Sequence, residues 1–121
     1  EPVDAAWPTV LITGRQLEHW HTGAMTRRSA VLDALEPAAV ATLAPGELAR
    51  LGLAPGAALT IETRRGRITL AARADPLMPE GMVFVPFCYV EAAANLLTNP
   101  ALDPYGKIPE FKYAACRLAA G

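Results

Sequence analysis

The chain has 121 residues, of which 52% are hydrophobic, and 11 lysine and arginine residues face 12 aspartates and glutamates. This length matches one domain that buries about two-thirds of its unfolded surface. The balanced charge excludes a global field that would draw the chain to nucleic acid or to an anionic membrane. The longest candidate for a membrane span, around Met82 to Phe87, is far shorter than the roughly 20 residues of a membrane-spanning helix. Cys88 and Cys116 are too few for a disulfide framework, so we expect both to be reduced and structural.

Short apolar runs between 11 prolines and 9 glycines favour a β-rich fold. The clearest element is a hairpin, because alternation puts Leu59, Ile61, Ile68 and Leu70 on one face while Arg64-Arg65-Gly66 makes the turn. In chain order, the expected strands are Trp7–Ile12, Ala39–Leu43, Leu59–Thr63, Arg67–Ala72, Met82–Val85 and Tyr113–Leu118.

Two short helices are expected between these strands. Glu47–Leu51 is followed by Gly52 as a C-terminal cap, and Glu91–Leu97 is rich in helix formers and is ended by Pro100. About six short strands without a repeat favour a closed barrel, because closure removes exposed strand edges. We therefore expect one domain over residues 1–121, a mainly β barrel with short helices.

Three polar segments fall outside the strand pattern, each at the end of a predicted strand or helix: residues 13–22, 87–95 and 107–112. A loop anchored on a strand end is where binding residues usually lie. An arginine fork binds phosphate bidentately, and a nearby lysine adds a point charge. If the segments converge, they suit a large, phosphate-bearing, heterocyclic ligand. They would supply cations (Arg15, Lys112), polar groups for a heterocycle edge (Gln16, His21, Asn95), hydroxyls (Thr13, Thr22) and aromatic faces (Trp20, Phe87).

Metal and catalytic interpretations have less support. His19 and His21 could begin a metal site, but no third ligand follows at a recognisable spacing. Ser29 is the only serine and lacks the glycine context of a nucleophile elbow, and no glycine-rich phosphate loop is present. The residues alone predict a β-barrel binding module for an anionic ligand, with no catalytic residue and no metal ligand.

Packing and solvation offer simpler explanations for several other residues. We expect Arg27-Arg28 and Arg64-Arg65 to be solvated surface. Trp20 and Phe87 could equally serve as packing residues.

Three stretches stand out together: Thr13-Gly14-Arg15 with His19 to Arg28, then Glu91 to Thr98, then Lys107 to Lys112. In this order they resemble the C-terminal domain of molybdenum or tungsten oxidoreductases that carry a bis-molybdopterin guanine dinucleotide cofactor. Formate dehydrogenase catalytic subunits are the nearest members. The resemblance runs from about Val10 to the end of the chain, and it is specific because three long stretches occur in sequence.

In that family the domain is a six-stranded double-psi β-barrel with short helices, and it caps the cofactor against preceding domains. The resemblance implies that Phe87 lies towards the substrate channel. We expect the backbone N–H groups of Thr13 to Arg15 and the Arg15 side chain to hold the pyrophosphate. The expected cofactor-binding residues are Thr13, Gly14, Arg15, Gln16, His19, Trp20, His21, Thr22, Asn95 and Lys112.

The resemblance further implies that this chain is a C-terminal fragment of a larger subunit, inactive by itself, which oxidises formate to carbon dioxide with loss of two electrons. Molybdenum or tungsten, its protein ligand, the catalytic residues and an iron–sulfur cluster belong to the upstream region in that family. The expected partners are the upstream domains and electron-transfer subunits, without nucleic acid or membrane insertion. A cytoplasmic location is expected, and a periplasmic one stays open.

Two alternatives remain open at this point. Many members related to formate dehydrogenases carry a histidine shortly after a Pro-Phe pair, whereas Cys88-Tyr89-Val90 follows Pro86-Phe87 here. Because nitrate reductases share much of the His-Trp-His-Thr-Gly pattern, nitrate reduction is the alternative reaction. A free-standing double-psi barrel that acts as an interaction module is the alternative from another class.

Overall fold

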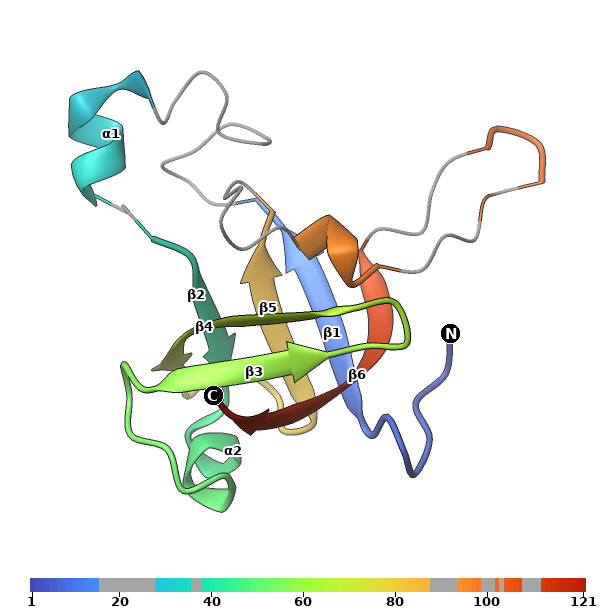
Figure 1. Cartoon of the computed structure of the whole chain (residues 1–121), viewed down its shortest axis with the longest axis horizontal. Coiled ribbons are helices and arrows are strands. Elements are labelled where there is room, and N and C mark those ends of the chain that lie inside the picture. Colours follow the sequence, from blue (N-terminus) through green and yellow to red (C-terminus); the bar gives the residue numbers. More distant parts are fainter. Residues whose placement is uncertain (16–27, 36–37, 88–93, 99–101, 103, 108–111) are drawn as a thin grey trace.

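The computed structural model describes residues 1–15, 28–35, 38–87, 94–98, 102, 104–107 and 112–121. Within these residues six strands form a closed barrel with the order β1-β5-β2-β4-β3-β6 (Figure 1). This confirms the predicted fold class. The strands are β1 (Thr9–Gly14), β2 (Val40–Leu43), β3 (Ala58–Glu62), β4 (Arg67–Ala74), β5 (Met82–Pro86) and β6 (Tyr113–Ala120).

Strand direction explains how the chain closes on itself. β1 runs parallel to β5, and β2 runs parallel to β4, so each of these pairs needs a crossover connection. The other neighbours are antiparallel, including the predicted hairpin of β3 and β4. β6 is shared: its first half pairs with β1 and its second half with β3. The barrel therefore joins segments that lie far apart in the sequence.

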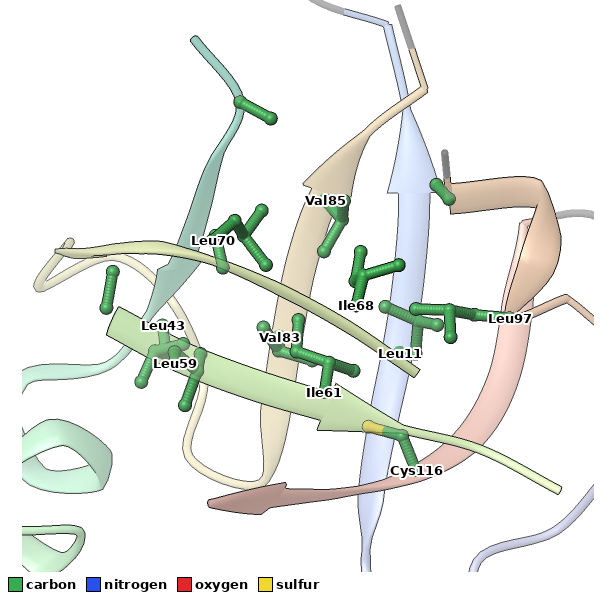
Figure 2. Close-up of a cluster of buried hydrophobic side chains, with 14 of the residues drawn as sticks. Leu11, Leu43, Leu59, Ile61, Ile68, Leu70, Val83, Val85, Leu97 and Cys116 are labelled. Carbon is green, nitrogen blue, oxygen red and sulfur yellow. The ribbon is translucent and has the colours of Figure 1, made fainter. Parts of the chain in front are cut away.

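The core fills the barrel with alternate residues of the strands (Figure 2). The predicted inward positions of the hairpin, Leu59, Ile61, Ile68 and Leu70, are at most 8% exposed, which confirms the alternation. Burial of each such side chain stabilises the fold by about 1.5–3 kcal/mol. Cys116 lies in the same core as a free, fully buried thiol, as predicted. Burial raises the pKa of this thiol to about 12, which keeps it protonated.

Short helices connect the strands. The predicted helix before Gly52 is α2 (Pro45–Arg50), and Gly52 follows its C-cap residue with a φ of +70°, a conformation that glycine adopts without strain. α1 (Ala30–Leu35) was not predicted. In the predicted helix Glu91–Leu97 the described residues form the 3-10 turn η3 (Ala94–Leu96), and the earlier part lies outside the described residues. None of the helices that the structure describes is long and apolar enough to cross a membrane.

The first strand begins later than predicted. The Asp4 carboxylate accepts hydrogen bonds of 2.9 Å from the N–H groups of Ala6 and Trp7. A side chain that captures its own backbone in this way favours a turn. Trp7 therefore belongs to a turn, and β1 starts at Thr9.

Candidate functional site

The described ends of the three polar segments meet at one end of the barrel, which we call the loop end. β1 and β5 stop side by side, with Gly14 opposite Pro86. The Phe87 N–H donates a hydrogen bond of 3.2 Å to the Gly14 carbonyl, and the Thr13 N–H donates one of 3.4 Å to the Lys112 carbonyl. Residues 13–15, 87 and 112 are thus linked through the backbone. The predicted convergence holds for these anchors.

Thr13 and Gly14 sit where space is tight. Thr13 is only 2% exposed. A Cβ atom on Gly14 would lie 2.8 Å from Cε2 of Phe84, a neighbour on β5. Glycine is therefore required here by a close approach between the strand end and an aromatic ring.

The cations of the loop end lie just beyond these buried positions. Arg15 follows the last residue of β1, Lys112 precedes the first residue of β6, and both are exposed. Phe87 is partly buried against the core, so its ring serves packing as the simpler interpretation stated. The Thr13 N–H donates to the Lys112 carbonyl in this structure. The predicted role of the 13–15 backbone in holding the pyrophosphate stays a prediction.

The 3-10 turn η3 carries the far end of the second polar segment. Ala94 and Leu97 are 1% and 0% exposed, so the turn is anchored by its apolar side chains, and Leu97 joins the core cluster (Figure 2). Asn95 lies in η3, between these anchors. The turn rests on the β3–β4 hairpin, because a Cβ on Gly66 would lie 3.2 Å from the Leu96 carbonyl oxygen.

Arg64 is exposed, as predicted, but Arg65 differs from the prediction of a solvated surface. Their guanidinium groups approach the Glu1 carboxylate at 3.1 and 2.6 Å, and the Arg65 side chain is only 21% exposed. Arg65 also donates a hydrogen bond of 2.8 Å to the Leu97 carbonyl. The prediction failed because it considered the turn alone, whereas the partner carboxylate lies more than 60 residues earlier. Arg28 is exposed, as predicted.

Several predicted residues lie outside the part of the chain that the structure describes: Gln16, His19, Trp20, His21, Thr22, Arg27 and Cys88. Their roles stay predictions. Among the residues that are described, no three histidine, cysteine, aspartate or glutamate side chains form a group that could hold a metal ion.

A hollow of about 580 Å³ lies at the opposite end of the barrel, beside α2. Glu47 contributes to its lining and is 1% exposed, but its carboxylate accepts the Gly81 N–H at 2.8 Å and pairs with Arg50. These contacts fix the connection into β5. The other lining residues are Pro8, Thr9, Arg50, Leu51, Glu80, Gly81, Arg117 and Leu118.

A closed β-barrel with exposed cations around a tight glycine at its strand ends defines a domain that binds an anionic small molecule. Residues 9–115 match the family described as the molydopterin dinucleotide binding domain. The chain belongs to this family, and its ligand is the molybdopterin dinucleotide cofactor. The donor set fits such a ligand, because Arg15 and Lys112 supply the cations that phosphate requires.

Similar proteins support the assignment. The chain is 40% identical to F420-dependent formate dehydrogenase 1 subunit alpha of Methanococcus maripaludis, over 98% of the chain and 18% of that protein. It is 41% identical to F420-dependent formate dehydrogenase subunit alpha of Methanocaldococcus jannaschii, over 95% of the chain and 17% of that protein. The solved structure of acetylene hydratase from Pelobacter acetylenicus aligns with a TM-score of 0.82 over 95% of the chain and 18% of its own chain, at 21% identity. That likeness shows the fold.

Proposed function

We propose that this chain is the C-terminal cofactor-binding domain of a formate dehydrogenase catalytic subunit, and that it holds a bis-molybdopterin guanine dinucleotide at the loop end. The observation that carries the proposal is the set of backbone hydrogen bonds that link the end of β1 at Gly14 to Phe87 and Lys112. These bonds bring together one described end of each polar segment, and η3 is not among the residues they link. The 40% identity to formate dehydrogenase alpha subunits supports the reaction. When bound, the cofactor supplies the two-electron chemistry.

The chain's own residues bind and orient the cofactor. The Arg15 guanidinium pairs with the pyrophosphate, since a planar fork can donate two parallel hydrogen bonds to phosphate oxygens. Lys112 adds a second positive charge just before β6, and Asn95 of η3 is a further proposed contact. Gln16, His19, Trp20, His21 and Thr22 complete the proposed contacts, and Phe87 borders the substrate channel.

The remaining parts of the proposed enzyme lie beyond these residues. The chain spans 17% and 18% of the two relatives. We assign residues 1–121 to one domain of a larger cytoplasmic subunit, whose upstream domains provide the metal ligand, an iron–sulfur cluster and contacts with electron-transfer subunits.

Replacement of Arg15 by alanine in the full-length subunit tests the proposal. We expect cofactor affinity to fall roughly tenfold, because one charge-assisted contact contributes about 1.5–3 kcal/mol. The measurement is molybdenum, tungsten and pterin content per subunit. Arg73→Ala is the matched control, because Arg73 is an exposed arginine near the far end of β4. Formate and nitrate oxidoreductase assays on the same preparations separate the two reactions. Unchanged metal and pterin content in Arg15→Ala would remove Arg15 from the site.

A further inference from the structure

Ala115 of β6 lies opposite Val10 of β1, just beyond the stretch of β6 that pairs with β3. β3 and β6 pair from Leu59 opposite Ala120 to Glu62 opposite Arg117, and there their pairing ends. Ala115 lies two residues before Arg117 and is fully buried. A buried N–H without an acceptor would cost about 1–3 kcal/mol. The Glu1 carboxylate takes this place, because its Oε2 accepts the Ala115 N–H at 3.0 Å.

The same carboxylate forms a fork-to-fork pair with Arg65. Arg65 Nη1 donates to Glu1 Oε1 at 2.6 Å, and Arg65 Nη2 donates to Glu1 Oε2 at 3.0 Å. The hydrogen bond from Arg65 is the main cause that lowers the pKa of Glu1 to about 2. The carboxylate is therefore charged throughout the neutral range.

Arg65 makes a second contact that reaches the cofactor region. Its Nη2 also donates to the Leu97 carbonyl at 2.8 Å. The Leu97 N–H closes η3 by donating to the Ala94 carbonyl at 3.0 Å. One guanidinium thus connects Glu1 with the turn that contains Asn95. A lysine could not replace it, because a single ammonium lacks the planar fork.

Neighbouring contacts hold the rest of the segment that carries Glu1. Arg64 pairs with Asp4 at 2.5 Å. The guanidinium carbons of Arg64 and Arg117 lie 5.3 and 4.8 Å from the centroid of the Trp7 ring, within the range of cation–π attraction. Figure 1 shows the N-terminus beside the β3–β4 turn and β6. Residues 1–7 are therefore fastened to the barrel at both of their ends.

These contacts point to Arg65 as a positioning residue of the dinucleotide site. Held by Glu1, it fixes the Leu97 carbonyl and with it the backbone of η3, the turn that contains the predicted contact residue Asn95. The inference rests on the proposed function, because it requires that η3 contacts the bound cofactor. It assigns the segment before β1 a role in cofactor affinity, although that segment lies away from the strand ends that carry Arg15 and Lys112.

The test uses the 121-residue chain with GDP as the probe for the guanine and diphosphate part of the ligand. Glu1→Gln and Arg65→Lys each remove the fork but keep side-chain size. We expect amide exchange at Leu97 to rise about tenfold and GDP binding to weaken about tenfold in both variants. Arg64→Lys is the matched control, because Arg64 contacts Glu1 but not Leu97. We expect less than about a twofold change in both measurements for it.

The pattern of exchange separates positioning from a general loss of structure. Positioning predicts faster exchange at Leu97 with little change at Leu59 and Ile61 in β3, whereas plain destabilisation raises exchange at all three amides. Uniform exchange, or unchanged exchange at Leu97, would overturn the inference. So would GDP affinity that equals wild type while Leu97 exchanges faster.

The proposed function is decided separately, by the Arg15→Ala experiment in the full-length subunit, because the upstream domains complete the proposed pocket. If the wild-type chain does not bind GDP, the site-specific exchange at Leu97 alone decides whether Arg65 positions η3. If Arg65→Lys does not fold, Glu1→Gln carries the test, because it leaves Arg65 in place.

Discussion

The two ends of the barrel solve the same physical problem with different parts. Each end is covered by a short helical segment whose leucine enters the core, Leu48 from α2 and Leu97 beside η3. At each end a carboxylate accepts a backbone N–H, Glu47 from Gly81 and Glu1 from Ala115. Both ends therefore satisfy buried polar groups while they exclude water from the core.

The difference lies in how far apart the interacting residues are in the sequence. Glu47 pairs with Arg50 three residues later in the same helix, and Arg50 is largely exposed. Glu1 pairs with Arg65, which is 64 residues away and only 21% exposed. A local pair forms as soon as its helix forms, whereas a distant pair requires the whole barrel. The contact that joins Glu1, Arg65 and the Leu97 carbonyl can therefore open while the strands stay intact.

The largest expected effects come from the two leucines. Leu97→Ala and Leu48→Ala should each lower the free energy of unfolding by about 2–4 kcal/mol, because both remove a buried side chain and leave a cavity. Urea denaturation measures this loss. Only Leu97→Ala should also weaken GDP binding by the chain, since only Leu97 supports η3. Equal GDP affinities in the two variants would show that the ends do not differ in function.

Acid should weaken the contact between Glu1 and Arg65. The pKa of Glu1 in the folded chain is about 2, against an ordinary value of 4.5. A depressed pKa means that Glu1 contributes its full stabilisation above about pH 4.5 and loses it as the pH falls from 4.5 towards 2. Glu1→Gln should therefore lower the free energy of unfolding at pH 7 by about 1–2 kcal/mol, less than the full shift implies because solvent screens the pair.

The measurement for Glu1 is a series of urea denaturation curves between pH 2 and pH 7 for the wild type and Glu1→Gln. The two free energies of unfolding should converge as the pH approaches 2. Parallel curves over this range would contradict a role for the Glu1 charge.

Local sequence patterns predicted most of the barrel. The β3–β4 hairpin followed from alternation, and α2 followed from the glycine that comes after its C-cap residue, because both signals involve neighbouring residues. α1 has only six residues, which is too short for a helical period to stand out. The predicted start of β1 was too early. The turn before the strand is set by hydrogen bonds to the Asp4 side chain, which leave no trace in the apolar pattern.

The candidate site was predictable in part for the same reason. Polar segments at strand ends indicated where Gly14, Phe87 and Lys112 would meet. The contact between Glu1 and Arg65 left no local signal, because nothing near the Arg64-Arg65 turn announces an acceptor more than 60 residues away. Such pairs become visible only when the strand register is known.

The smallest expected effects separate two glycines that are needed for different reasons. Gly52, beside α2, has a φ of +70° and open space where a Cβ would lie, whereas a Cβ on Gly14 at the loop end would lie 2.8 Å from Cε2 of Phe84. Gly52→Ala and Gly14→Ala should each cost about 1 kcal/mol, the first through backbone strain and the second through displacement of the ring. A double-mutant cycle with Phe84→Leu distinguishes these causes. The effect of Phe84→Leu on stability should add to that of Gly52→Ala. It should offset part of the destabilisation by Gly14→Ala, because the shorter leucine side chain frees the space. If the effects of Gly14→Ala and Phe84→Leu on the free energy of unfolding are strictly additive, the Phe84 ring is not what excludes a side chain at Gly14. The close packing of the strand end beside Arg15 would then need another explanation.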